Sequence, residues 1–198
     1  LLFLTSTISI NMSAQEKNTI KDSQGLPYYQ IPDYPESYSP ENVAARMIDG
    51  LGFRFYWATE GLTEKDLEYT PGNDGRSTGH TIDHIYGLTL TILNASLNKP
   101  NVFPRDEEEL TFEQKRALTL KNIEMASQVL KDQNANTLEN NKVIFQSENG
   151  SSEYPYWNMI NGPIADAIYH TGQVVSFRRS SGNPINPNIR VFLGTVRE

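Results

Sequence analysis

The sequence predicts an all-α fold, a four-helix bundle with an extended N-terminal arm and a C-terminal tail. Apolar residues recur at helical spacing over four long segments, at about 40–60, 78–97, 112–132 and 163–181. Stretches rich in Pro, Gly, Asn and Asp separate these segments, as in the connections of a bundle. All three histidines fall in two of the segments, each four residues from another histidine or an aspartate.

The composition limits the chemistry that this chain can carry. Its 198 residues are enough for one domain with a substantial core, and it contains no cysteine. Disulfides, thiolate nucleophiles and cysteine-bound metals are therefore excluded, so a metal would have to be held by imidazole and carboxylate groups. The formal net charge of -7 argues against a nucleic acid as partner, because no Lys/Arg cluster is present to replace its counterions.

The N-terminal residues suggest export. Residues 1–14 are apolar and then small and polar, which is the pattern of a truncated signal peptide, and they are too short and too polar for a stable membrane span. We therefore expect a periplasmic or secreted protein; if the segment is instead an ordinary strand or helix, the protein is cytoplasmic. Residues 15–39, rich in Pro and Tyr, predict an extended arm on a domain that covers 40–198.

The first helix has a clear start. Ser39 is a good N-cap, and Pro40 suits the first helical position. The helix should run to about Glu60. Its glycines, Gly50 and Gly52, suggest the close approach of another helix.

The second helix should begin near Thr78 and end by Leu97. The third should begin after a capping box formed by Thr111 and Gln114, and extend to about Asp132. We interpret its charged side chains as a solvated face without function; they are Lys115, Arg116, Lys121 and Glu124.

The fourth helix leaves two alternatives open at its start. Either it begins at Pro163, or residues 154–160 form a kinked segment that precedes it, because proline breaks a helical hydrogen bond. Residues 180–184 end it, and an extended strap follows. The Asn-rich stretch 133–153 is loop-like, with a short strand as one alternative at Val143–Phe145.

Two polar pairs could meet inside this bundle. Asp166 and His170 lie one helical turn apart on one face, with Gln173 three residues further on, and His80 and His84 repeat the spacing. Such pairs on packed helices can hold a divalent transition metal such as Zn, Ni, Fe or Mn. Each residue also has an ordinary structural explanation, as a surface group, a cap of the first turn or a partner of nearby backbone.

The stretches GRSTGHTIDHIYGL at 75–88 and ADAIYHTGQVVSFRRSSGNP at 165–184 resemble the metal-ligand helices of the DinB-like (DinB/YfiT) superfamily. In that family one ligand histidine lies on the second helix and two lie on the last, in an H-x-x-x-H pattern followed by x-G-Q. The match makes His84 and His170 ligands, and Asp166 stands where the family usually has a histidine. The aspartate makes the ligand set richer in oxygen, so Mn, Fe or Zn becomes as suitable as nickel.

The resemblance implies a metal-dependent enzyme, often dimeric, whose metal activates water or a low-molecular-weight thiol in a hydrolase or S-transferase acting on a small molecule. His80 and Gln173 would be a fourth ligand or would orient the ligands. The candidates for pocket lining are Tyr86, Trp157, Asn158, Asn161 and Tyr169.

Other features leave a second hypothesis open, namely a non-catalytic exported binding protein with a structural metal or none. No nucleophile or general base stands out beyond the candidate ligands. We interpret Gly172 as a helix-packing residue, and Arg178 and Arg179 as helix-end charges.

Overall fold

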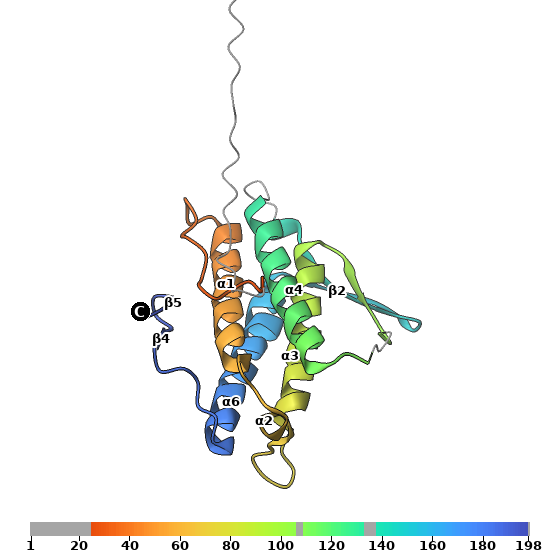
Figure 1. Cartoon of the computed structure of the whole chain (residues 1–198). Helices are drawn as coiled ribbons and strands as arrows, with labels where there is room; N and C mark the ends of the chain where they lie inside the picture. Colours follow the sequence, from red (N-terminus) through yellow and green to blue (C-terminus); the bar gives the residue numbers. More distant parts are fainter. Residues whose placement is uncertain (1–24, 106–108, 133–137, 198) are drawn as a thin grey trace, which may run out of the picture.

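The computed structural model describes residues 25–105, 109–132 and 138–197 (Figure 1). Its long helices are α1 (Pro40–Thr59), α3 (Thr78–Ser96), α4 (Phe112–Asp132) and α6 (Ala165–Ser181). Helix α1 packs against α4 and α6, and α3 packs against the same two helices. The helical class predicted from the sequence is confirmed.

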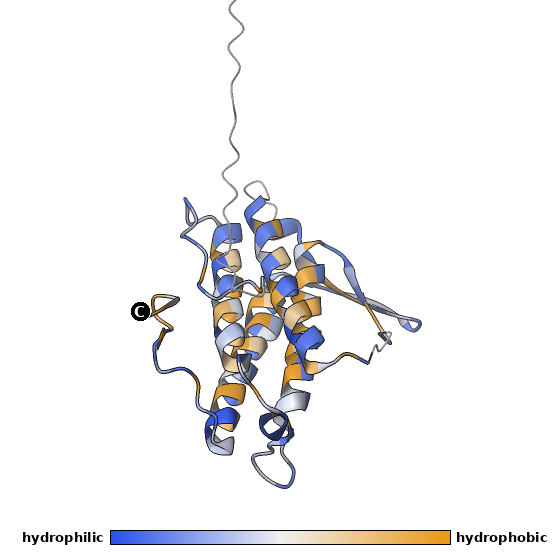
Figure 2. Ribbon diagram, in the orientation of Figure 1, coloured by the Kyte–Doolittle hydropathy of each residue, from blue (hydrophilic) through white to orange (hydrophobic). Residues whose placement is uncertain are grey.

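Apolar side chains from the four long helices meet in one core. Figure 2 shows hydrophobic residues along each of these helices. Fully buried members are Ile48, Leu51 and Phe55 from α1, Ile82, Ile85 and Ile92 from α3, Leu120, Ile123 and Leu130 from α4, and Ala167 and Val174 from α6. Burying one such large side chain stabilises a fold by about 1.5–3 kcal/mol. This packing, more than helix propensity, therefore holds the helices side by side.

Several helix ends form as the sequence predicts. The backbone amide of Asn42 donates to Ser39 Oγ at 3.2 Å at the start of α1. Before α4, the Thr111 amide donates to Gln114 Oε1 at 2.9 Å and the Gln114 amide donates to Thr111 Oγ1 at 3.3 Å. Gly182 ends α6 in the left-handed region, with φ of 103°.

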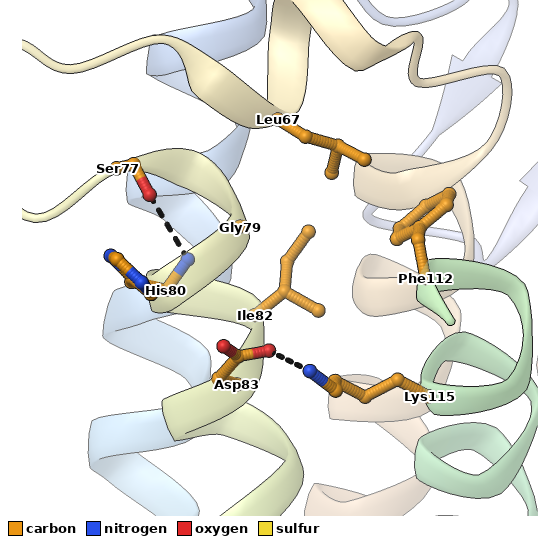
Figure 3. Close-up of a pocket in the computed structure, with 8 residues that line it drawn as sticks. All are labelled: Leu67, Ser77, Gly79, His80, Ile82, Asp83, Phe112 and Lys115. Carbon is orange, nitrogen blue, oxygen red and sulfur yellow. Dashed lines mark hydrogen bonds and ion pairs between the residues drawn. The ribbon is translucent and has the colours of Figure 1, made fainter. Parts of the chain in front are cut away.

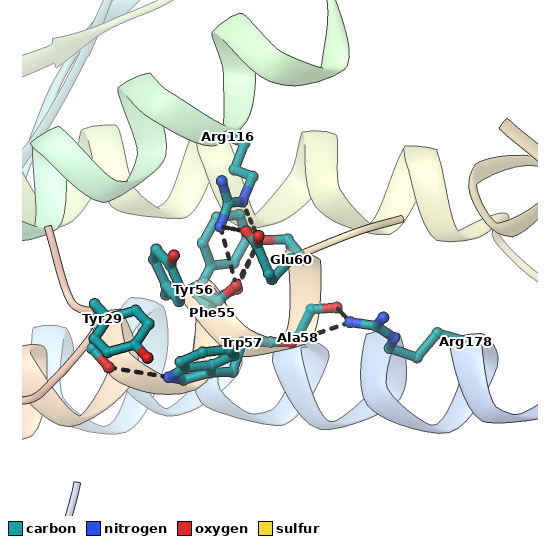
Figure 4. Close-up of polar contacts among 9 residues, drawn as sticks. Tyr29, Phe55, Tyr56, Trp57, Ala58, Glu60, Arg116 and Arg178 are labelled. Carbon is teal, nitrogen blue, oxygen red and sulfur yellow. Dashed lines mark hydrogen bonds and ion pairs between the residues drawn. The ribbon is translucent and has the colours of Figure 1, made fainter. Parts of the chain in front are cut away.

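Helix α1 has no basic residue in its last turn. Arginines from two other helices donate hydrogen bonds to the carbonyls there instead (Figure 4). Arg178 Nη1 donates to the carbonyls of Trp57 and Ala58, both at 3.0 Å, and Arg116 Nη2 donates to the carbonyl of Tyr56 at 3.3 Å. Both arginines are buried, at 3% and 7% exposure. The prediction that Arg116 lies on a solvated face is therefore wrong, and Arg178 is more than a surface charge at a helix end.

The N-terminal arm contributes to the core. Residues 25–39 form neither helix nor strand, but Tyr28 is fully buried, and its hydroxyl donates to Asp49 Oδ1 at 3.0 Å. Burial, followed by the charge of Asp49, raises the pKa of this phenol. A Cβ atom at Gly52 would lie 2.6 Å from the Tyr28 ring. The close approach at Gly52 is thus made by the arm, and the expectation of a second helix there is wrong.

We expect Gly52→Ala to lower the free energy of unfolding by about 1–3 kcal/mol, because the buried Tyr28 ring has no room to move aside. Gly172→Ala is the matched control, since Gly172 also lies in a helix but a Cβ atom added there would meet no neighbouring atom within 4 Å. The control should be neutral or stabilising by up to about 1 kcal/mol. Urea unfolding followed by circular dichroism measures both, and equal effects would contradict the close packing at Gly52. The same open space shows that Gly172 is not a helix-packing residue.

The fold also contains strands, so the expectation of an all-α chain is too strict. Three strands form one sheet: β1 (Pro100–Val102) runs parallel to β2 (Lys142–Ser147), which pairs antiparallel with β3 (Gly150–Pro155). The strand suggested at Val143–Phe145 lies within β2. Two further strands, β4 (Ile189–Arg190) and β5 (Thr195–Val196), pair in the C-terminal tail.

Shorter elements link the long helices; they are α2 (Glu64–Glu68), η1 (Leu138–Asn140), α5 (Trp157–Met159) and the π-helical turn η2 (Ile160–Ile164). In the described ranges, no helix has the length and apolar character needed to cross a membrane. The predicted signal peptide, residues 1–14, lies outside the described residues, as does the start of the arm.

Candidate metal centre

Three polar side chains converge where α3 and α6 pack together. His84 projects from the second turn of α3, and Asp166 and His170 lie one turn apart on α6. Their candidate ligand atoms all lie within 4.8 Å of one another. The structure thus brings together the three residues that the sequence assigned to a metal.

The kink before α6 determines where this helix begins. Gly162 has φ of -98° and ψ of -107°, and Pro163 follows it inside η2. Because proline has no amide hydrogen, the helical hydrogen-bond pattern is interrupted there. Of the two alternatives that the sequence left open, a kinked helical segment does precede α6, but it starts at Trp157, because Tyr154 and Pro155 belong to β3. Asp166 is the second residue of α6.

The distances suit a first-row ion. His84 Nε2 lies 3.2 Å from Asp166 Oδ2, and His170 Nε2 lies 3.3 Å from Asp166 Oδ1. Ligands that each lie about 2.1 Å from one ion are about 3.0–3.5 Å from each other in tetrahedral or octahedral sites. The two imidazole rings contact each other edge to face, with centroids 4.7 Å apart. The two contacts with Asp166 lie in this ligand-to-ligand range, but the group as a whole spans up to 4.8 Å, so the ligand atoms would have to move closer together to share an ion.

Gln173 fixes the orientation of one histidine. Its Oε1 lies 2.7 Å from His170 Nδ1. Because an amide oxygen can only accept, Nδ1 is the donor in this hydrogen bond, and Nε2 is the ring nitrogen that faces Asp166. Gln173 thus contacts the His170 ring, and its two predicted roles at a metal stay predictions.

The cluster is partly open to solvent. The side chains of His84 and Asp166 are 36% and 43% exposed, whereas His170 is 16% exposed. A pocket of about 460 Å³ lies next to Asp166, lined by Leu88, Asn161, Gly162, Pro163, Ala165, Asp166 and Tyr169. Of the predicted lining residues, Asn161 and Tyr169 belong to this pocket. Tyr86, Trp157 and Asn158 do not line it.

His80 lies outside the cluster. It is exposed and lines a different pocket of about 230 Å³ between α2, α3 and α4, beside an ion pair of Asp83 with Lys115 (Figure 3). Its backbone amide donates to the N-cap Ser77 at 3.2 Å. The ligand group found among the described residues does not include it.

Sequence reasoning missed part of the pocket wall. Leu88 lies one turn after His84 on α3, and Ala165 directly precedes Asp166, so both face the pocket beside a candidate ligand. Helical spacing from the ligands could have identified Leu88. The contribution of Pro163 depends on the kink, which the sequence left undecided.

Comparison with known proteins supports the fold. No family model matches the sequence, and no curated protein matches it. Among solved structures, the chain is similar to the crystal structure of a DinB-like protein, YjoA, from Bacillus subtilis, with a TM-score of 0.53 and 13% sequence identity. The match covers 72% of this chain and 96% of that chain. The protein therefore has the DinB-like fold that its sequence predicted.

Proposed function

We propose that this protein is a metal-dependent enzyme in which His84, Asp166 and His170 hold one divalent transition-metal ion. The observation that carries the proposal is the convergence of their ligand atoms within 4.8 Å. In this proposal α1, α3, α4 and α6 form a four-helix bundle of the DinB type, with the ion between α3 and α6. Imidazole and carboxylate ligands suit Zn, Ni, Fe or Mn.

The directions of the two imidazole rings support a shared metal ion at this position. His170 Nδ1 contacts Gln173 Oε1, so its Nε2 is the ring nitrogen that faces Asp166 Oδ1, at 3.3 Å. His84 Nε2 faces Asp166 Oδ2 at 3.2 Å. Two imidazoles that point at one carboxylate from two helices are the arrangement that a metal ion held by these three residues requires.

The exposure of the cluster supports catalysis over a purely structural role. Three protein ligands leave coordination positions open, and the exposed side of Asp166 and His84 gives a small molecule access to them. A divalent ion bound there would supply Lewis acidity, lowering the pKa of a water or low-molecular-weight thiol that it binds. Asp166 and the two histidines would hold and orient the ion, and the adjoining pocket would position the substrate.

Metal binding tests the proposal directly. Metal-free protein should take up about one equivalent of Zn or Co, and His170→Ala should weaken this binding by about a hundredfold or more. His80→Ala is the matched control, because it removes a histidine from α3 outside the cluster and should leave the affinity unchanged. Chelator competition with elemental analysis gives the affinities, and circular dichroism confirms folding.

Equal losses of metal affinity in His170→Ala and His80→Ala, or no metal uptake by the wild-type protein, would refute the metal site. The alternative would then stand, a non-catalytic helical binding protein. Export through residues 1–14 and assembly as a homodimer remain predictions from the sequence.

A further inference from the structure

The pocket beside Asp166 is an open, shallow hollow with room for a small molecule. Its volume of about 460 Å³ lies within the range of ligand pockets in proteins. Leu88, Pro163, Ala165 and the ring of Tyr169 make most of its wall apolar. Asn161 is its uncharged polar side chain, and Asp166 its carboxylate. None of the described residues that line it is Lys or Arg.

Tyr169 offers an open aromatic face. Its side chain is 64% exposed although it lies beside the candidate ligands. Its ring contacts the His170 ring edge to face, with centroids 5.3 Å apart and an interplanar angle of 70°. This contact restrains the orientation of the ring without covering it, so a planar group in the pocket can stack on it.

The charges around the pocket disfavour an anion. Asp166 brings a carboxylate to the lining, and a cation that contacts α3 at Gly87, next to Leu88, is already engaged. That cation, Arg105, donates to the carbonyl of Gly87 and to Thr91 Oγ1, both at 3.0 Å, and lies over the Phe103 ring. A carboxylate bound in the pocket would therefore meet Asp166 without a lining cation to offset the repulsion.

We propose that this pocket selects an uncharged aromatic small molecule, with its ring on Tyr169 and a neutral polar group within reach of the Asn161 amide. The inference is a binding preference of the pocket with Asp166 free of metal, so it does not rest on the proposed function. A neutral aromatic thiol or amide fits this class, and a carboxylate-rich peptide thiol does not.

Benzamide and benzoate test the proposal, because they share size and shape and differ in charge. Metal-free protein is used so that benzoate cannot bind through an ion. Benzamide should bind about tenfold more tightly than benzoate, given one like-charge contact in a partly exposed site. Tyr169→Ala should weaken benzamide binding about fivefold through loss of stacking. Tyr38→Ala, at a tyrosine that is 98% exposed on the arm, should leave it unchanged.

Ligand-detected NMR titration gives these affinities, and zinc uptake is measured on the same samples. Equal or tighter binding of benzoate, no binding of benzamide, or an equal effect of the two tyrosine variants would overturn the proposal. Benzamide binding through Tyr169 in a protein that takes up no zinc would refute the metal enzyme and leave the pocket preference intact. Zinc uptake without benzamide binding would leave the metal site intact and refute the pocket preference.

Discussion

Arg178→Met should lower the free energy of unfolding by about 3–5 kcal/mol, the largest loss of stability that we expect from one substitution in this chain. The guanidinium is 3% exposed and donates to the last-turn carbonyls of α1 at Trp57 and Ala58. Its Nε also donates to the carbonyl of Asn183 at 2.7 Å, and burial lowers the pKa of Arg178. Methionine fills similar volume without donors, so three backbone carbonyls and the side-chain oxygen of Asn183 lose their partner.

Arg179→Met is the matched control for this prediction. Arg179 is the next residue of α6 but is exposed, so its replacement should change stability by less than about 0.5 kcal/mol. Urea unfolding followed by circular dichroism gives both values. Similar losses in the two variants would show that the contacts with α1 do not stabilise the fold.

The two adjacent arginines show where prediction from sequence stops. Residues 180–184, which follow the two arginines, correctly indicated the end of α6, since Gly is favoured after a helix. Whether Arg178 or Arg179 points into the core depends on where α1 lies. Nothing in the sequence at the C-terminal end of α1 indicates that its last carbonyls accept hydrogen bonds from another helix. Arg116 was misassigned for the same reason, because a charged residue in an amphipathic helix is usually solvated.

The small sheet was predicted only in part because its strands lack a local signal. Strand β2 contains the apolar run Val143–Phe145, whereas β3 reads GSSEYP and every residue in it is exposed. Its pairing follows from the turn at Ser147–Gly150 and from the hydrogen bonds of β2, not from alternating hydrophobicity.

The site was more predictable than the sheet because its residues obey helical spacing. Asp166 and His170 share a face of α6 at four-residue spacing, and the contact of α3 with α6 brings His84 to them. His80 and His84 have the same spacing, yet His80 is exposed one turn away. Spacing places two side chains on one face of a helix, but only the partner helix decides which of them meets another ligand.

Asp66→Asn should lower the free energy of unfolding by about 3 kcal/mol at neutral pH and flatten its dependence on acid pH. Burial opposes ionisation of this carboxylate, which is 1% exposed, but hydrogen bonds from Asn183, Ser181 and Thr63 outweigh it and hold the pKa of Asp66 well below its usual range. Asn183 Nδ2 donates at 2.7 Å and the Thr63 amide at 2.8 Å. These bonds tie the start of α2 to the end of α6, so losing the charge loosens both elements.

The sign of the pH effect follows from the lowered pKa in the folded state. The ionised carboxylate stabilises the fold fully above the unfolded pKa of about 3.9, and this contribution is lost as the pH falls through that value toward the folded pKa. Wild-type stability should therefore drop more steeply below about pH 4 than that of Asp66→Asn, which has no proton to bind there. Asp74→Asn, at an exposed loop position, controls for the general effect of removing one carboxylate and should keep the wild-type slope. Urea unfolding at a series of pH values measures the slopes, and a wild-type slope in Asp66→Asn would show that other carboxylates carry the acid sensitivity.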